Sequence, residues 1–276
     1  TSISANGRYV AFGSYATTLV AGDAGVDWDV FVRDTQTNTT VRCSVTSTGG
    51  DPNNNCDDIA ISPDGRYVAF RSNATNIVPA AANGVTQVYR FDRVSGQIAL
   101  VSCDANGVPG NQYSQTPNFS ADGRYVVFGT DSSNLGFSDN NGTNDVYRKD
   151  MLTGQVALVS IDFSTGAAPA LGAFAFSGAP SISADARWVA FSTLVPFAPN
   201  DVTYSDVYLR DMVGNTHTLI SLGLSGQSVT GAMGDLSADG KHVLFSSAAA
   251  NIVPNDTNSL SDVFVRDVVL GQTTRE

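Results

Sequence analysis

The hydrophobic and polar positions of this chain repeat, and the repeat predicts short β-strands. The block "SPDGRYVAF" at Ser62–Phe70 joins two apolar runs through a polar turn. Related blocks end at the same apolar position in four other places: Phe12, Phe128, Phe191 and Phe245. Asp-Gly or Asn-Gly between such runs is typical of a tight β-hairpin, because glycine tolerates a positive φ. We therefore predict five hairpins, and Ala186 at the glycine position of the fourth should cost turn stability.

A second block follows each hairpin and predicts a third strand. It reads "DVFVRD" in the first and fifth copies, and the five copies start at Asp29, Gln87, Asp145, Asp206 and Asp262. After four of these blocks comes a β-rich run, such as "TTVRCSV", which predicts a fourth strand, whereas the last copy stops at "QTTRE". The hairpin phenylalanines lie 54 to 63 residues apart. This period is typical of repeated units that bury their faces against their neighbours.

These units predict an all-β fold, a five-bladed β-propeller with four antiparallel strands per blade. We expect one propeller domain over residues 1–276, with blades at about 1–58, 59–116, 117–179, 180–233 and 234–276. A complete blade starts near Thr1, so the ring should close by face packing between the first and fifth blades, without strand exchange. Because the chain starts on one strand and stops within another, we also expect it to be part of a longer polypeptide.

The repeated "SxDGRYVAF" and "DVFVRD" blocks resemble the TolB-type propeller repeat, a relative of the WD-type repeats, over essentially the whole chain. The resemblance implies a bacterial protein that acts outside the cytoplasm, in the periplasm, at the cell surface or after secretion. Family members include periplasmic binding scaffolds and propeller domains of some peptidases, and similar repeats occur in a pectin-fragment lyase. This chain departs from the TolB pattern, since it has five repeats rather than six and a long loop in every repeat.

Charge and hydropathy narrow the range of partners. The formal net charge is −11, whereas a surface that binds phosphates needs clustered lysines and arginines. We therefore expect no nucleic-acid partner. No apolar run approaches the roughly 20 residues of a membrane-spanning helix, so we expect no membrane insertion either.

The sequence contains few of the residues that common catalytic sites use. Its two histidines, His217 and His242, lack the serine and acidic residues of a catalytic triad around them. A P-loop, a dinucleotide-binding fingerprint and zinc-ligand spacing are also missing from the sequence. Paired carboxylates for glycoside hydrolysis stay an alternative, because their separation in space is invisible in a sequence.

Aspartates recur at the end of the third strand of every repeat. Because this position is repeated, we interpret these residues as hairpin caps that bond backbone N–H groups. They are Asp34, Asp92, Asp150, Asp211 and Asp267.

The long loop between the second and third strands carries a different acidic pattern, which predicts calcium. In the first, third and fifth repeats, an aspartate precedes by six residues the aspartate that opens the third strand. Calcium takes six to eight oxygen ligands from carboxylates, amides and carbonyls. The predicted ligands are Asp23, Asp29, Asp139, Asn141, Asp145, Asp256, Asn258 and Asp262. The alternative is that these side chains cap their own loops without metal. The second repeat has Ala81 and Gln87 instead, so we expect no metal there.

Two further features suggest testable contacts. Cys43 and Cys56 should be bonded or close in space, across the connection between the first two repeats, or else they are simply buried with Cys103. Trp28 is the aromatic residue without a counterpart in the other loops. It either packs on its own loop or stacks on a sugar ring in a lectin-like site.

These observations favour a non-catalytic binding or interaction module of a bacterial extracytoplasmic protein, stabilised by calcium, with a protein or glycan ligand. The alternatives are a polysaccharide-active enzyme, either a glycoside hydrolase or a lyase, and a lectin-like glycan binder that uses the mouth of the propeller. An architectural propeller that supports a neighbouring domain is a third class.

Overall fold

The computed structural model describes residues 1–276 apart from 24, 140, 163–165, 169–177, 204 and 259. In this part of the chain, twenty β-strands form, together with one short 3-10 turn, η1 (Pro79–Ala81). By their contacts the residues divide into two compact units: unit one contains residues 1–138 and 148–157, and unit two contains residues 139–147 and 158–276. No helix among the described residues is long and apolar enough to cross a membrane.

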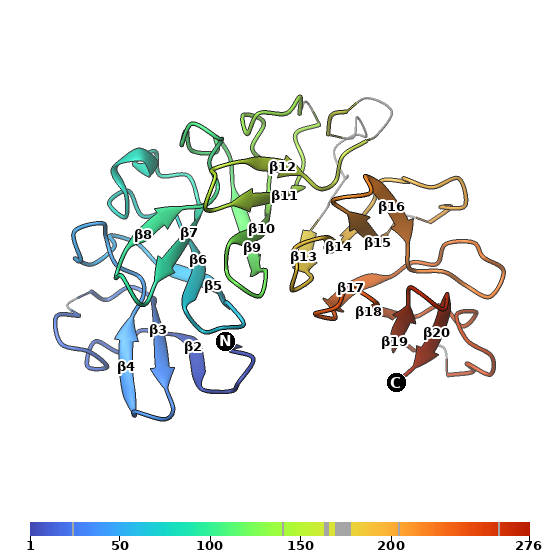
Figure 1. Ribbon diagram of the computed structural model, residues 1–276, viewed down its shortest axis with the longest axis horizontal. Helices are drawn as coiled ribbons and strands as arrows, with labels where there is room; N and C mark the ends of the chain where they lie inside the picture. Colours follow the sequence, from blue (N-terminus) through green and yellow to red (C-terminus); the bar gives the residue numbers. More distant parts are fainter. Residues whose placement is uncertain (24, 140, 163–165, 169–177, 204, 259) are drawn as a thin grey trace. The chain divides into compact units, whose positions relative to one another are not determined.

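The strands form five four-stranded sheets (Figure 1). The first sheet contains β1 (Ser2–Ile3), β2 (Tyr9–Ser14), β3 (Asp29–Asp34) and β4 (Thr39–Arg42). The second contains β5 (Cys56–Ile61), β6 (Tyr67–Ser72), β7 (Gln87–Asp92) and β8 (Ile98–Leu100). The third contains β9 (Ser114–Phe119), β10 (Tyr125–Thr130), β11 (Asp145–Asp150) and β12 (Val156–Leu158).

The last two sheets follow the same plan. The fourth contains β13 (Gly178–Ile182), β14 (Trp188–Thr193), β15 (Asp206–Asp211) and β16 (Thr216–Leu219). The fifth contains β17 (Ala232–Leu236), β18 (His242–Ser247), β19 (Asp262–Asp267) and β20 (Gln272–Arg275). Each described sheet consists of four consecutive strands that pair in chain order. The predicted all-β fold, with five blades of four antiparallel strands, is therefore confirmed.

The sheets begin slightly earlier in the chain than the repeat suggested. Their first strands start at Cys56, Ser114, Gly178 and Ala232, each two or three residues before the expected blade boundary. These first strands differ widely in sequence between blades. Consequently no recurring pattern marks where they begin.

The hairpin turn is closed by a serine and by the aspartate or asparagine that directly precedes the residue with a positive φ. In the second sheet, Ser62 Oγ donates to Asp64 Oδ1 (2.5 Å) and accepts from the N–H of Tyr67 (2.9 Å). The corresponding residues of the other four sheets form the same two bonds. The next residue has a positive φ, 76° at Gly65 and 60° at Ala186. Ala186 thus adopts the left-handed conformation that glycine adopts more readily.

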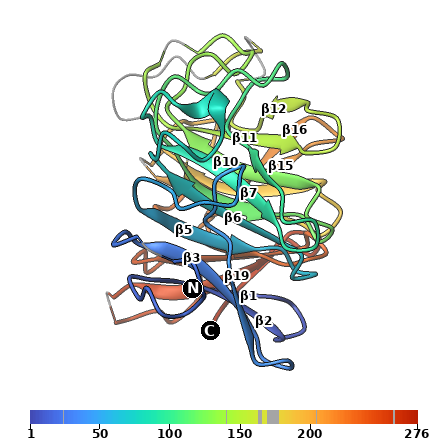
Figure 2. The ribbon, with the colours of Figure 1, turned by 90° about the vertical axis from the view of Figure 1, so that its left-hand side faces the viewer.

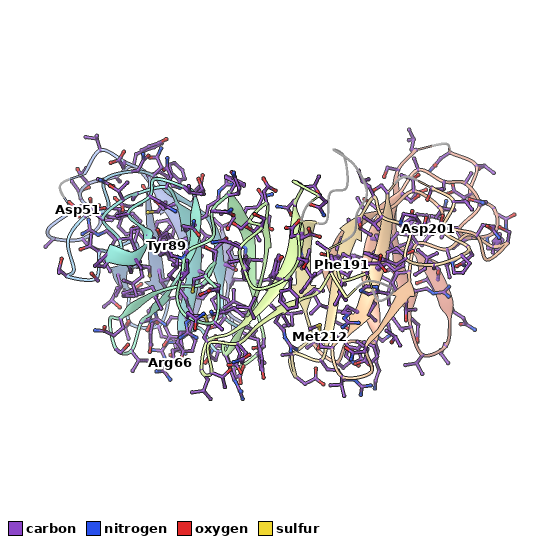
Figure 3. All side chains as sticks on the ribbon, turned by 90° about the horizontal axis from the view of Figure 1, so that it is seen from above. Asp51, Arg66, Tyr89, Phe191, Asp201 and Met212 are labelled. Carbon is purple, nitrogen blue, oxygen red and sulfur yellow. The ribbon has the colours of Figure 1, made fainter. Side chains whose placement is uncertain are left out.

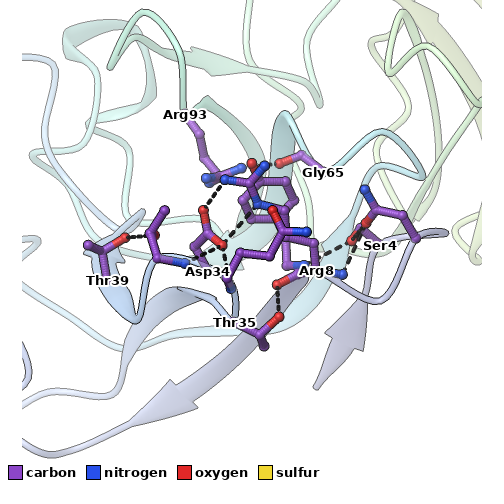
Figure 4. A network of polar contacts seen from close by, with 11 residues as sticks. Ser4, Arg8, Asp34, Thr35, Thr39, Gly65 and Arg93 are labelled. Carbon is purple, nitrogen blue, oxygen red and sulfur yellow. Dashed lines mark hydrogen bonds and ion pairs between the residues drawn. The ribbon is translucent and has the colours of Figure 1, made fainter.

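An arginine after each of the first four turns pairs with the aspartate that ends the third strand. Arg8 Nε and Nη2 donate to the two carboxylate oxygens of Asp34, at 2.9 and 2.6 Å (Figure 4). The equivalent bidentate pairs are Arg66–Asp92, Arg124–Asp150 and Arg187–Asp211. In the fifth sheet Lys241 takes the place of the arginine and lies 3.8 Å from Asp239 instead.

The same aspartates cap the turn that follows them. Asp34 Oδ1 accepts from the backbone N–H of Gln36 at 2.9 Å. The other four aspartates accept the N–H two residues later, at 2.8 to 2.9 Å. The predicted capping role is therefore confirmed, and the arginine pair is an addition that the sequence did not suggest.

In unit one the second sheet packs on the first (Figure 2), and buried residues of both form one hydrophobic cluster. The ring of Tyr9 lies so close to Gly65 that a Cβ on this glycine would overlap it. The guanidinium of Arg93 lies 3.9 Å from the centroid of the Tyr9 ring. The turn glycine of one blade is therefore also a packing surface for the aromatic side chain of the preceding blade.

The three cysteines are free and buried. Cys43 and Cys56 both belong to the hydrophobic cluster of the first two sheets. Burial raises the pKa of each thiol to about 12, so both stay protonated. The expected disulfide alternative is wrong: the two thiols donate to the carbonyls of Val41 and Asn54 instead.

Candidate functional site

The acidic loops and the hairpin turns lie at opposite edges of the blades. In unit one, Asp51 lies near one edge and Arg66 near the other, with Tyr89 between them (Figure 3). In unit two, Asp201 and Met212 lie toward opposite edges in the same way, with Phe191 between them (Figure 3). The loop chemistry is thus separate from the arginine–aspartate pairs that hold the turns.

In the first blade, an arginine neutralises the predicted calcium loop. Arg42 Nη1 lies 3.3 Å from Asp23 Oδ1 and also forms an ion pair with Asp51. Asp29 accepts a hydrogen bond from Ser44 Oγ at 2.6 Å. Burial raises the pKa of Asp29. The positive charge that a calcium ion would supply is therefore already present beside Asp23.

The fifth blade repeats this arrangement. Arg275 Nη1 lies 3.1 Å from Asp256 Oδ1 and 3.5 Å from Asp262 Oδ2. Asn258 Nδ2 lies 3.2 Å from both carboxylate oxygens of Asp262 and donates to them. The two predicted carboxylate ligands of this blade thus share one guanidinium.

A pattern in the sequence accounts for these arginines. Arg42 and Arg275 pair in register with Phe31 and Phe264, the aromatic residues of the two "DVFVRD" strands. In the other blades a tyrosine replaces this phenylalanine, and a leucine stands eleven residues after it in place of the arginine. These pairs are Tyr89 with Leu100, Tyr147 with Leu158, and Tyr208 with Leu219. A blade therefore combines either phenylalanine with arginine or tyrosine with leucine.

The third blade is the one where a predicted calcium loop lacks this arginine. Asp139 and Asp145 are both buried. Asp139 Oδ1 accepts from the N–H of Asn141 at 3.3 Å. Asp145 accepts from Asn141 Nδ2 at 2.9 Å and from Ser160 Oγ at 2.7 Å. The three predicted ligands of this blade are therefore brought together, with Leu158 at the position that carries arginine in the first and fifth blades.

The fourth blade uses hydroxyl groups beside its two carboxylates. The Tyr208 hydroxyl donates to Asp201 Oδ2 at 2.7 Å. Thr203 Oγ1 donates to Asp206 and lies 2.8 Å from its Oδ2. Burial raises the pKa of Asp206 to about 6, and a hydrogen bond with Asp201 adds to the rise. Asp206 thus keeps its proton to a higher pH than an exposed aspartate does.

The second blade has an amide where the others have a carboxylate. Gln87 is buried, donates to the carbonyl of Gly110 at 2.7 Å and accepts from Ser102 Oγ at 2.5 Å. Ala81 stands at the position of the first loop aspartate. The buried Tyr89 hydroxyl has no hydrogen-bond partner within the described part of the chain. The loop between Ser72 and Gln87 contains no carboxylate, so the expectation that this blade binds no calcium stays a prediction.

The eight predicted calcium ligands therefore lie in three separate loop clusters. Nowhere in the described residues do three or more His, Cys, Asp or Glu side chains group so that they could hold a metal. Calcium stays a prediction, and its donors in any one loop would include amide and backbone oxygens.

Trp28 lines a hollow of about 710 Å³, which we call the Trp28 hollow. Its ring lies against the backbone of β2 at Gly13, where a Cβ would overlap it. The Tyr15 ring meets the Trp28 ring at 79°, with the centroids 4.6 Å apart, so the two form an aromatic corner. The lining residues are Thr1, Gly13, Tyr15, Trp28, Asn55, Asp57, Asp58 and Ile59.

The other side of the Trp28 hollow is polar and acidic. Asn55 Oδ1 accepts from the backbone N–H of Trp28 at 2.7 Å and so fixes this part of the loop. Asp57 pairs with Arg71 Nε at 2.6 Å, yet its side chain stays 49% exposed. Asp58 has a φ of 54° and accepts from the N–H of Thr116 at 2.6 Å. Sequence reasoning missed these acids, because they come from a first strand that no repeat pattern marks.

The two histidines take structural roles. His217 Nε2 bonds the carbonyl of Val159 at 3.0 Å, and its ring lies 4.5 Å from that of Phe197. Burial lowers the pKa of His217 to about 4. His242 Nε2 lies 3.7 Å from Asp267.

Comparisons of the sequence with protein-family models and with curated proteins find no match. Solved structures do match. TolB from Acinetobacter baumannii is 14% identical, with a TM-score of 0.55 over 99% of this chain and 52% of that one. The β-propeller domain of the Trilobed protease from Pyrococcus furiosus is 12% identical, with a TM-score of 0.55 over 96% and 67%. A prolyl endopeptidase is 14% identical, with a TM-score of 0.56 over 90% and 32%.

The fold is that of a TolB-like β-propeller. The likeness extends over nearly all of this chain, which spans about half the length of the Acinetobacter TolB. At these identities the comparison establishes the fold alone. The function of this TolB-like propeller must therefore be argued from its own side chains.

Proposed function

We propose that this TolB-like propeller is a non-catalytic binding module that acts outside the cytoplasm. The observation that carries the proposal is the Trp28 hollow, which combines an aromatic corner with carboxylate and amide groups. Its size falls within the roughly 300–1,000 Å³ of small-molecule sites. The extracytoplasmic location follows from the resemblance of the repeats to the TolB type.

A polysaccharide-active enzyme is the second candidate, because Asp57 and Asp58 both line the hollow. Glycoside hydrolysis uses two carboxyl groups that flank the scissile bond. However, Asp57 pairs with Arg71, and Asp58 accepts a backbone N–H. Both carboxyl groups are therefore already engaged by donors of the protein itself, which favours binding over hydrolysis.

The test uses tryptophan fluorescence. The chain contains two tryptophans, Trp28 and Trp188, so the Trp188→Phe variant reports on the hollow alone. Soluble oligosaccharides and short peptides are titrated into this variant, and the samples are then analysed for cleavage products. A saturable change in Trp28 emission with an intact ligand supports the proposal. Cleavage products would instead support the polysaccharide-active enzyme. An unchanged Trp28 emission with every probe would refute the hollow as the binding surface.

Calcium remains part of the proposal, and we narrow it to the third blade. Asp139 and Asp145 are buried carboxylates with an amide side chain between them in sequence, a donor set that suits a hard cation. In the first and fifth blades, Arg42 and Arg275 already neutralise the carboxylates. When bound, calcium would tie the loop before β11 to that strand and so stabilise the blade.

A further inference from the structure

We infer that the Trp28 hollow binds a carbohydrate, and that it selects neutral or amino sugars over uronic acids. The inference rests on the proposed binding function and adds the class of ligand. It follows from three features of the hollow: the aromatic corner, the surrounding polar groups and the sign of the local charge.

The aromatic corner provides the stacking surface. A pyranose ring has a face of C–H groups that packs on the π-face of an aromatic ring, and Trp and Tyr offer the largest such faces with a polar end. Tyr15 is 61% exposed, so a ligand can reach its ring. Gly13 lets the Trp28 ring lie directly on the strand backbone, so the indole is held rigidly and loses little entropy on binding.

The polar side of the hollow provides hydrogen-bond partners for hydroxyl groups. Asp57 retains exposed carboxylate surface while Arg71 fixes its orientation. Arg71 is itself held over the Tyr113 ring, 5.3 Å from its centroid. Vicinal sugar hydroxyls need acceptors that are fixed in this way, because a preorganised partner costs less to engage.

The local charge sets the preference among sugars. Asp57 and Asp58 both face Arg71, with nearest atoms at 2.6 and 3.9 Å, which leaves one negative charge in excess in this group. The chain as a whole carries −11. A uronate would meet like charge, whereas a protonated amino sugar would meet an opposite one.

The decisive experiment compares three probes on the Trp188→Phe variant: cellohexaose, a chitosan oligosaccharide and an oligogalacturonate. We expect saturable changes in Trp28 emission with the first two and none with the third. Added salt should weaken the chitosan response and leave the cellohexaose response unchanged, because only the former is electrostatic.

Two variants test the named groups. Tyr15→Ala should weaken the affinity for cellohexaose at least tenfold, since it removes half of the corner. Asp57→Asn keeps an acceptor but removes the charge, so it should reduce the preference for chitosan over cellohexaose. Tyr125→Phe, in β10 and outside the lining of the hollow, is the control and should retain binding.

The outcomes separate the inference from the proposed function. If short peptides but no oligosaccharide change the Trp28 emission, the binding module stands and the carbohydrate inference is wrong. If an oligosaccharide binds and is cleaved, the carbohydrate inference stands and the non-catalytic proposal is wrong. Tighter binding of the oligogalacturonate than of cellohexaose would overturn the charge argument.

Discussion

At the scale of single residues, the repeat places the same residue type in different surroundings, so the chain supplies its own matched controls. Gly7 follows Asn6 and Gly65 follows Asp64 in their hairpin turns, with φ of 70° and 76°. A Cβ at Gly7 would meet nothing within 4 Å, whereas one at Gly65 would overlap the Tyr9 ring. The first glycine is therefore needed for its backbone conformation alone, and the second also for packing between blades.

We predict that Gly7→Ala lowers the free energy of unfolding by about 1 kcal/mol, the cost of a left-handed alanine. Gly65→Ala should cost about 1–3 kcal/mol more, because Tyr9 must move. Chemical denaturation of the two variants measures the difference. Equal losses would show that Tyr9 adjusts freely and that the contact with Gly65 adds nothing to stability.

A second matched pair concerns two buried tyrosines. The Tyr208 hydroxyl donates to Asp201 and accepts from the N–H of Phe197, whereas the Tyr89 hydroxyl has no partner among the described residues. Tyr208→Phe should therefore destabilise the protein by about 2 kcal/mol, since it leaves buried groups unpaired. Tyr89→Phe should be neutral or stabilising by up to about 1 kcal/mol.

Thermal and chemical denaturation of both phenylalanine variants provide the measurement. Ala81→Asp, with Tyr89 unchanged, serves as the control. It gives the second blade the loop carboxylate that the fourth blade has at Asp201. A loss of 2 kcal/mol in Tyr89→Phe would mean that the hydroxyl makes a bond, for example to an ordered water.

At the scale of the structural elements, much of the architecture could be predicted from the sequence. Five copies of the hairpin block and of "DVFVRD" specify ten of the strands directly, because turn residues and β-rich runs act locally. The capping aspartates followed from their repetition, and Asp34 shows the expected bond. The first strands were located less well, since their sequences share no pattern that a local signal could reveal.

The chemistry of the loops depended on contacts that sequence reasoning did not consider. The arginine partners of the capping aspartates lie 26 residues upstream in the first three blades, a spacing that was available in the sequence. The alternation of phenylalanine–arginine with tyrosine–leucine was equally visible. Neither was interpretable without the register that places Phe31 beside Arg42. The Trp28 hollow joins residues of different strands, so only the fold could assemble it.

The element-scale prediction concerns calcium in the third blade. Binding to the folded state alone should add roughly 2.7 kcal/mol of stability at a hundredfold excess over Kd. A chelator should therefore lower the Tm of the wild type, and calcium should restore it better than magnesium, which prefers a tighter octahedral shell. Asp145→Asn should abolish the response, whereas Asp262→Asn in the fifth blade should retain it.

Two results would count against this proposal. If chelation leaves the Tm of the wild type unchanged, Asp139 and Asp145 are loop caps without metal. If Asp262→Asn abolishes the response as well as Asp145→Asn, the guanidinium of Arg275 does not replace calcium in the fifth blade. The variant Arg275→Leu gives the fifth blade the leucine that the third blade has. The proposal expects this variant to gain calcium binding in the fifth blade, and an unchanged calcium response would contradict it.

At the scale of the whole molecule, each sheet consists of its own four consecutive strands. No described strand is therefore shared between the first and fifth sheets. Closure of the ring between these two blades stays a prediction. The stability of the folded protein also depends on the titratable groups that the blades bury.

The fourth blade contains two such groups with opposite effects on stability. Burial raises the pKa of Asp206 to about 6, against roughly 3.9 for an unfolded aspartate. The contribution of Asp206 to the free energy of unfolding is therefore largest below pH 3.9, and it is lost as the pH rises through 6. Burial lowers the pKa of His217 to about 4, against roughly 6.5 unfolded. Its neutral form is favoured above pH 6.5, and that contribution is lost as the pH falls toward 4.

We therefore predict opposite pH dependences for two variants between pH 5 and pH 7. The advantage of the wild type over Asp206→Asn should shrink by about 1 kcal/mol as the pH rises, because the wild type must release its proton. The advantage over His217→Phe should grow by about 1–2 kcal/mol over the same range. At pH 5 protonation of His217 stabilises the unfolded chain alone, and this stabilisation is lost by pH 7. Urea denaturation of the three proteins at both pH values gives these differences. If the two differences in the free energy of unfolding changed in the same direction with pH, the opposite pKa shifts of Asp206 and His217 would be wrong.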